Sequence, residues 1–247
     1  MSAGDVVLWH LAMSHYNEKA RWALEYKRVP HRRRAVMPGL HQLVALKLGG
    51  RVTMPVLTIG DDVYPDSTEI VAALEKRWPE PPLYPADPDL RREALALEDE
   101  LDEVLAPAVR QLAYQRLLGD HDAAATFLAF GGPPSRRTQV RLAMPLLALA
   151  IRENFGVPDR EDSGPAETIT RVVEDLGRRL GDRQFLVGDS FTVADLSACA
   201  YLAPLVCLDA IPSRPPLPPL FEDVTGRIAG MAAGAWAADT YRAYRLR

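Results

Sequence analysis

Cysteine is scarce in this sequence. Cys199 and Cys207 are its two cysteines, and both fall within one predicted helix. Two thiols placed in this way do not form the disulfide framework of a secreted protein, and their spacing matches no metal-binding motif. We therefore expect two core thiols, no metal ion and a reducing compartment, the cytoplasm.

Long apolar runs are missing as well. No stretch approaches the roughly 20 apolar residues that a membrane-spanning helix needs. The N-terminal region carries Asp5 where a secretory signal would be basic, and its short apolar run is typical of a strand. These absences lead us to expect no membrane partner and no secretion.

An excess of charge of one sign is also absent. The 29 Lys and Arg and the 33 Asp and Glu residues give a formal net charge of −4, which offers no electrostatic reason to expect a nucleic-acid partner. We interpret the run Arg32–Arg34 as the solvated edge of a strand or loop. The acidic residues between Glu98 and Glu103 are expected to form a solvated helix face.

The residues that are present, 48% hydrophobic and 25% charged, are typical of a globular protein. The chain up to residue 79 alternates strands with helices, which predicts a small α/β unit with a mixed sheet. The expected strands are 6–11, 31–36, 55–59 and one beginning at 63. The expected helices are 15–27, 40–48 and 66–77, and the second of them places Leu40, Leu43, Val44 and Leu48 on one side.

Prolines separate this unit from the rest of the chain. They make residues 80–87 a stiff linker between a predicted domain at 1–79 and an all-helical domain at 88–247. A long helix is expected at 90–118 with a kink at Pro107. Further helices are expected at 123–130, 139–155, 167–180 and 192–208, followed by two short ones.

Three helix starts carry capping residues. Ser14 stands between the first strand and the first helix, where its hydroxyl can accept a hydrogen bond from a free amide of the helix or can stabilise an anion at the positive helix end. Both roles stay open from the residues alone. Asp66 with Glu69, and Thr192 with Asp195, are predicted capping boxes.

Four segments, taken in order, resemble the glutathione S-transferases. They are Ser14–Leu24, Thr53–Leu57, Asp66–Ile70 and Phe185–Asp195. The resemblance covers nearly the whole chain and is weakest over 119–165. It implies an α/β thioredoxin-like N-terminal domain with a mixed four-stranded sheet, an all-α domain after it, and a homodimer. It also implies glutathione as co-substrate and conjugation of its thiolate to a small apolar electrophile.

The resemblance implies a glutathione site on the first domain. Ser14 would donate a hydrogen bond to the thiolate, whose pKa of about 8.5 must fall by about two units, or roughly 2.7 kcal/mol. Met54, before a cis-Pro55, would pair its backbone with the cysteinyl unit. Asp66 would face the ammonium group, and Ser67 would bind the γ-glutamyl carboxylate. The alternatives are a trans proline opening an edge strand and an Asp66 that only caps its helix.

The electrophile would lie between the domains. Candidates for its pocket are His10, Tyr16, Arg110 and Tyr114, the last two of which share one face of the long helix. His10 and Tyr16 have structural or packing roles as alternatives, and Arg110 and Tyr114 a solvated face or a dimer surface. Asn17 and Ser14 stand where redox relatives have cysteines, so dithiol–disulfide exchange is not expected.

Two other functions remain open. One is a glutathione-transferase-fold protein that binds without catalysis or uses a different low-molecular-weight thiol. The other reads Arg214–Pro219 as a polyproline ligand for a partner domain, against the simpler reading of a rigid loop between helices.

Overall fold

The computed structural model describes residues 6–49, 51–158, 163–206 and 218–245. Its sheet has four strands in the order β2-β1-β3-β4. They are β1 (Val6–His10), β2 (Arg32–Ala35), β3 (Val56–Ile59) and β4 (Asp62–Tyr64). β1 runs parallel to β2 and antiparallel to β3, and β3 and β4 form a hairpin. The predicted mixed sheet is therefore confirmed.

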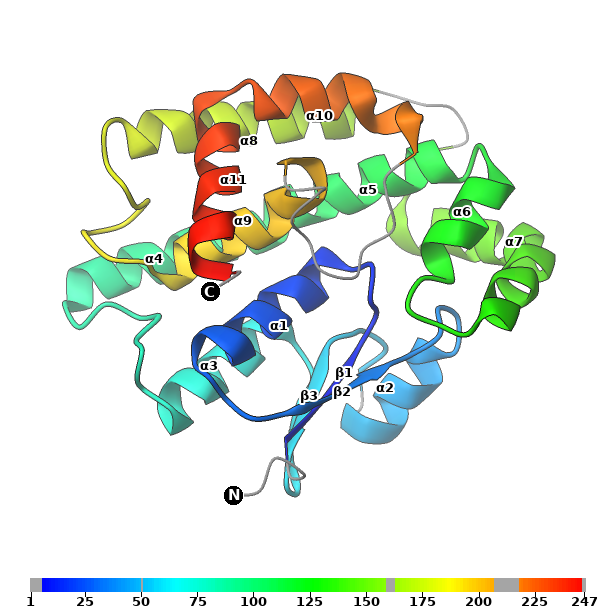
Figure 1. Ribbon diagram of the computed structural model, residues 1–247, viewed down its shortest axis with the longest axis horizontal. Helices are drawn as coiled ribbons and strands as arrows, with labels where there is room; N and C mark the ends of the chain where they lie inside the picture. Colours follow the sequence, from blue (N-terminus) through cyan, green and yellow to red (C-terminus); the bar gives the residue numbers. More distant parts are fainter. Residues whose placement is uncertain (1–5, 50, 159–162, 207–217, 246–247) are drawn as a thin grey trace.

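Both faces of the sheet are covered by helices. Side chains alternate along a strand, so Leu8 and Leu57 join the main core while Trp9 and Val56 join a second cluster on the other face. α1 (His15–Tyr26) and α3 (Ser67–Arg77) pack on the first face, and α2 (His41–Gly49) on the second (Figure 1). This arrangement brings the start of α1 to the end of β1.

The predicted apolar side of α2 is only partly covered. Val44 and Leu48 pack against the second cluster, whereas Leu40 and Leu43 are 53% and 66% exposed. The fully buried residue of this helix is Ala45. Ala45 lies in the cluster with Met54 and Val56, where a small side chain lets α2 approach β3 closely.

The rest of the described chain is helical. Its α-helices are α4 (Pro88–Glu100), α5 (Ala106–Leu117), α6 (His121–Leu128), α7 (Pro134–Phe155), α8 (Gly164–Leu180), α9 (Val193–Val206), α10 (Glu222–Ala229) and α11 (Ala232–Arg245). A short 3₁₀ turn, Pro219–Phe221, precedes α10. α11 has 14 residues and is not the short helix expected. No helix in the described ranges has the length and apolarity to cross a membrane.

α9 is the central helix of the molecule. Its residues from Val193 to Leu205 are buried, and it packs against α1, α4 and α11 (Figure 1). Cys199 lies in it with no exposed surface, which confirms one of the two predicted core thiols. Cys207, and almost all of the proline run 214–219, lie outside the described residues.

The expected long helix is interrupted, and the interruption is a π turn rather than a simple kink. Residues Leu101–Leu105 adopt π geometry between α4 and α5, and the Ala106 amide bonds to the Leu101 carbonyl five residues back. Pro107 has no amide hydrogen and its ring crowds the carbonyl four residues before it, so the regular pattern cannot pass this point. The π turn absorbs the mismatch.

α7 also differs from its expected range. It begins at Pro134, five positions before the predicted start at 139, because proline is favoured in the first turn of a helix. Pro145 lies inside it on the exposed side, and the helix continues. Exposed leucines also mark this side, namely Leu142, Leu146 and Leu149.

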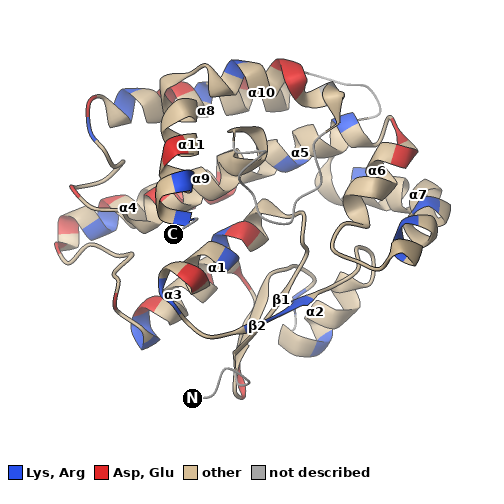
Figure 2. Cartoon of the chain, in the orientation of Figure 1, with Lys and Arg blue, Asp and Glu red and all other residues tan. Residues whose placement is uncertain are grey.

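Charges of both signs are interspersed along the helices (Figure 2). The basic strand β2 is an edge strand with exposed side chains, as predicted for Arg32–Arg34. Arg33 pairs with Glu25, and the Arg34 guanidinium lies 4.9 Å from the centre of the Trp9 ring. These arginines are thus engaged with neighbouring side chains.

Candidate functional site

Ser14 is the N-cap residue of α1, in an extended backbone conformation. Its hydroxyl nevertheless makes no capping hydrogen bond, so of the two roles left open by the sequence the structure does not show the capping one. The turn is closed by the backbone, where the Ser14 amide donates to the Leu11 carbonyl over 3.2 Å. The Ser14 hydroxyl is therefore not used by the helix and stands at its positive end, where an anion is favoured.

Arg21 fixes the same turn through its carbonyl groups. From the next turn of α1 its guanidinium donates to the carbonyls of Leu11 and Ser14, both at 3.3 Å. It also contacts Nδ1 of His10 at 3.0 Å and Glu18 at 2.8 Å. The Ser14 turn is therefore held through its carbonyl groups by a buried arginine.

A buried carboxylate fixes that arginine. Glu18 also accepts from Tyr241 at 2.8 Å and from Arg245 at 2.7 Å, both in α11. Burial raises the pKa of Glu18, but the guanidinium groups of Arg21 and Arg245 outweigh it and hold the value at about 2. The C-terminal helix thus reaches the Ser14 turn through a chain of charged hydrogen bonds.

His10, a candidate for the electrophile pocket, is part of this charged cluster. It is 8% exposed, and burial, followed by the charge of Arg21, lowers its pKa to about 4. It is therefore neutral at pH 7 and can accept from Arg21.

Asn17 joins the Ser14 turn to the Met54–Pro55 loop. Its Oδ1 accepts from the Leu11 amide at 3.0 Å, and its Nδ2 donates to the Met54 carbonyl at 3.3 Å. The Met54–Pro55 peptide bond is cis, as the resemblance implied. Sequence reasoning missed this bridging role, although a polar residue on the buried side of a helix was a visible signal.

Asp66 caps α3. Its Oδ1 accepts from the Thr68 amide at 2.8 Å, and Ser67 is 2% exposed at the first helical position. Glu69 does not complete the predicted box, because it pairs with Arg51 at 2.7 Å. In the other predicted box, Asp195 accepts from the amide and hydroxyl of Thr192 at 2.8 and 2.9 Å.

A second buried cluster surrounds Lys19 of α1. Its ammonium lies 2.7 Å from Glu98 of α4 and 3.0 Å from Asp102 in the π turn. It also donates to the Thr68 hydroxyl at 3.0 Å, and Tyr201 donates to Asp102. The expected solvated acidic face is thus wrong for Glu98, which is fully buried, and right for Asp99, Glu100 and Glu103.

The other three predicted pocket residues lie together. The Arg110 guanidinium is 5.6 Å from the centre of the Tyr16 ring and 4.4 Å from that of Phe155. Tyr114 stacks on Phe155 at 5.3 Å, and Gln111 donates to the Phe155 carbonyl at 3.1 Å. We call Tyr16, Arg110, Tyr114 and Phe155 the aromatic–arginine cluster.

The electrostatics of Tyr16 connect this cluster with the start of α3. Burial raises the pKa of Tyr16 to about 12, Arg110 opposes the rise, and the carboxylates of Asp102 and Asp66 add to it. Burial also raises the pKa of Tyr114. Both phenols are therefore neutral hydrogen-bonding groups at pH 7.

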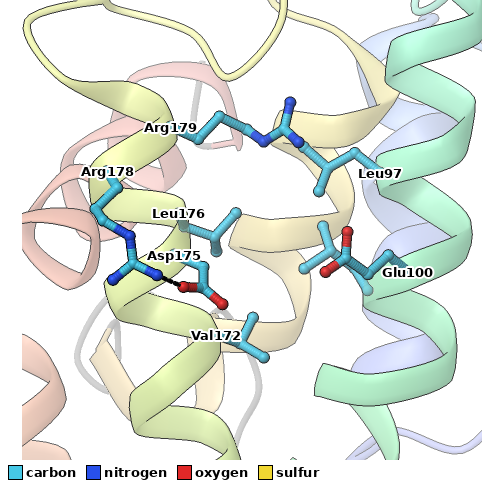
Figure 3. Close-up of a pocket in the computed structure, with 8 residues that line it drawn as sticks. Leu97, Glu100, Val172, Asp175, Leu176, Arg178 and Arg179 are labelled. Atoms are coloured by element: carbon cyan, nitrogen blue, oxygen red, sulfur yellow. Dashed lines mark hydrogen bonds and ion pairs between the residues drawn. The ribbon is translucent and has the colours of Figure 1, made fainter.

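Of the two cavities described next, only the smaller one is lined by a predicted site residue, Ser14. A crevice of about 10 Å³, enough for one water molecule, lies behind Ser14 between α1 and α9. A cavity of about 370 Å³ lies between α4 and α8 and contains none of the predicted site residues (Figure 3). Among the described residues, no group of three or more His, Cys, Asp or Glu side chains is placed to hold a metal ion.

Known proteins share this architecture. Residues 8–82 match the family model described as glutathione S-transferase, N-terminal domain. A search of curated proteins found no match. The beta-etherase LigF from Sphingobium sp. strain SYK-6 is 19% identical, with 96% of this chain and 100% of that chain covered and a TM-score of 0.64.

Two further solved structures are similar over nearly their whole length. Glutathione transferase GSTFuA3 from Phanerochaete chrysosporium is 18% identical, with 98% of each chain covered and a TM-score of 0.64. A glutathione S-transferase from Methylobacterium radiotolerans JCM 2831, in complex with glutathione sulfonate, is 24% identical, with 94% of each chain covered and a TM-score of 0.55. The chain therefore carries a glutathione S-transferase N-terminal domain at residues 8–82 and, over nearly its whole length, the glutathione transferase fold.

Proposed function

We propose that this chain is a glutathione S-transferase, in which Ser14 donates a hydrogen bond to the glutathione thiolate and the thiolate attacks a small apolar electrophile. The proposed enzyme acts in the cytoplasm, as the scarcity of cysteine indicates, and forms a homodimer, as the resemblance implies. One observation carries the proposal. The Ser14 hydroxyl is not used to cap α1, because backbone bonds and Arg21 hold the turn in its place.

The surrounding residues support a glutathione site. The cis bond before Pro55 and the bridge from Asn17 align the Met54 backbone with the Ser14 turn. At the other end of the site, Asp66 and Ser67 begin α3, whose N-terminus favours the γ-glutamyl carboxylate. The thiolate then needs about 2.7 kcal/mol of preferential stabilisation, which one charge-assisted hydrogen bond and a helix N-terminus supply.

Replacing Ser14 tests this proposal. We expect Ser14→Ala to lower turnover by roughly 10²–10³, the usual effect of removing one preorganised donor, and Ser14→Thr to retain part of it. A capping serine would cost about 0.5–2 kcal/mol of stability on replacement, but this hydroxyl makes no cap bond. Ser14→Ala should therefore lower the initial rate of conjugation while leaving the free energy of unfolding in urea nearly unchanged. Unchanged turnover in Ser14→Ala contradicts the proposal.

A non-catalytic role or a different thiol is the second candidate. The Met54 carbonyl, which would pair with the cysteinyl unit, already accepts a hydrogen bond from Asn17. Calorimetric titration of glutathione, and then of other small thiols, into the wild-type protein identifies the thiol, and detectable conjugation across a broad panel of electrophiles would rule out the non-catalytic role. Binding of another thiol without glutathione binding would favour this candidate.

A further inference from the structure

Arg110 of α5 is a partly buried cation without a counter-ion in the described part of the chain. No ion pair joins its guanidinium to a described carboxylate, and its Nε is buried without a hydrogen-bond partner. Arg21, Arg116 and Arg245, in contrast, each contact a carboxylate at 2.7–2.9 Å. Holding part of a guanidinium out of water without a hydrogen-bond partner is costly, so this half-buried position favours an anion from outside the chain.

The aromatic rings beside Arg110 indicate what the rest of the anionic ligand is. Phe155 and Tyr16 lie 4.4 and 5.6 Å from the guanidinium, and Tyr114 extends the stack. A ligand whose charged group reaches Arg110 therefore meets aromatic surfaces. Flat aromatic ligands pack well on such surfaces, because offset and edge contacts between rings are favourable.

The cluster is linked to the proposed thiol site through α1. Tyr16 follows Ser14 by two positions, so both belong to the first turn of that helix. The Tyr16 ring also lies 5.5 Å from that of Tyr201. Tyr201 and Thr68, which is near the start of α3, both donate to Asp102, so the cluster is connected to the start of α3 as well. An electrophile held at Arg110 is thus beside the segment that would bind glutathione.

We propose that Arg110 is the specificity-determining residue of the electrophile site and binds the carboxylate of an aromatic electrophile. The planar guanidinium can form two parallel hydrogen bonds to a carboxylate. This inference rests on the proposed transferase function and changes its electrophile, from a small apolar compound to an aromatic ring that carries a carboxylate.

The proposed conjugation can be written for an aryl chloride. The glutathione sulfur attacks the ring carbon that carries chlorine, so a C–S bond forms and the C–Cl bond breaks. Chloride leaves with the bonding electron pair. The carboxylate elsewhere on the ring is unchanged and stays on Arg110, and no oxidant or reductant is consumed.

A matched pair of substrates tests the role of Arg110. We would use 4-chloro-3-nitrobenzoate and its neutral counterpart 4-chloro-3-nitrobenzamide, and express kcat/KM relative to the uncatalysed rate of each. The wild-type protein is expected to favour the benzoate at least tenfold. Arg110→Met should lower the benzoate value roughly 10-fold to 100-fold, the range for losing a hydrogen bond to a charged group, and change the benzamide value less than threefold.

Two further variants keep the result interpretable. Arg110→Lys retains the charge without the planar fork, so its benzoate value should lie between those of wild type and Arg110→Met, and it carries the test if Arg110→Met fails to fold. Arg116→Met, in the same helix but paired with Asp223, should leave the preference unchanged. Equal effects of Arg110→Met and Arg110→Lys on both substrates, or none on either, overturn the inference.

Binding of 4-chloro-3-nitrobenzoate without thiol separates this inference from the proposed function. We expect calorimetry to show binding that Arg110→Met weakens about tenfold or more. Arg110-dependent binding without conjugation of either substrate would contradict the transferase and support the site. Conjugation of the benzamide with no measurable benzoate binding would support the transferase and overturn the site.

Discussion

Arg21 fixes the Ser14 turn, so the Ser14 hydroxyl is not needed to stabilise it. By donating to the carbonyls of Leu11 and Ser14, it fixes the turn that a capping hydroxyl would otherwise stabilise. Glu18 holds Arg21 in turn, and Tyr241 and Arg245 hold Glu18. A buried carboxylate shared by two arginines and a phenol needs all its partners, because removing one leaves charge uncompensated.

The titration of Glu18 gives a prediction at this scale. Its pKa is about 2 in the folded protein against the ordinary 4.5, as the charges of Arg21 and Arg245 outweigh burial. The unfolded chain takes up this proton first as the pH falls. The stability due to Glu18 is therefore complete above about pH 4.5 and lost as the pH falls towards 2.

Urea unfolding of wild type and Glu18→Gln over a pH series measures this effect. We expect the difference in free energy of unfolding to be constant above pH 5 and to shrink between pH 4.5 and 2. A difference that persists undiminished to pH 2 would show that Glu18 does not keep its charge at low pH.

At the scale of elements, α6, α7 and the loop between them support the Ser14 turn. Met13 packs in one hydrophobic cluster with Phe127, Leu128 and Met144. The loop approaches closely at Gly131, where an added Cβ would lie 3.0 Å from that of Ala12. α7 also ends at Phe155, which contacts Arg110. The part of the chain with the weakest resemblance therefore shapes the candidate site.

Gly131→Ala tests that support. Gly131 has φ +72°, and its added methyl group would press on the Ser14 turn. Gly60→Ala is a matched control, because Gly60 has φ +61° and nothing within 4 Å of an added Cβ. Both variants should lose about 1 kcal/mol from the backbone conformation. Only Gly131→Ala should also lower the conjugation rate, and equal rates in the two variants would show that the loop does not support the turn.

At the scale of the whole molecule, two buried charged clusters join α1 to the helical part of the chain. The cluster of Glu18 reaches α11, and that of Lys19 reaches α4, the π turn and α9. Burial raises the pKa of Glu98, and Lys19 opposes that rise. The contact between the two parts therefore combines the main apolar core with two buried charged clusters, whose contribution to stability depends on matched partners.

Removing the cation of the Lys19 cluster should destabilise the protein more than removing the charge of one of its carboxylates. Lys19→Met leaves Glu98 and Asp102 without their cation, so we expect a loss of about 3–5 kcal/mol in the free energy of unfolding. Glu98→Gln keeps the pair of Lys19 with Asp102 and should cost clearly less. Arg92→Gln, at an exposed pair, is the control and should change it by less than about 0.5 kcal/mol. Urea unfolding measures all three, and equal losses for Lys19→Met and Glu98→Gln would contradict this account.

The sequence by itself determined the mixed sheet and most of the helices. Periodicity and capping residues are local, so the strand ending at His10, the helix starting at His15 and the Asp66 cap could be read from short stretches. Ordered motifs added the cis bond before Pro55 and the transferase fold. The positions of glycine and proline predicted the ends of most helices and strands to within a few residues.

Only the tertiary structure decided which polar residues are buried and what each one contacts. Glu98 belongs to an acidic run that looks solvated, and it is buried because Lys19 of another element faces it. Asn17 bridges to Met54, and Arg110 meets Phe155, across 37 and 45 positions of sequence. Burial and charge pairing depend on distances between elements, which no local pattern encodes, so the fold could be predicted while the partners of its charged residues could not.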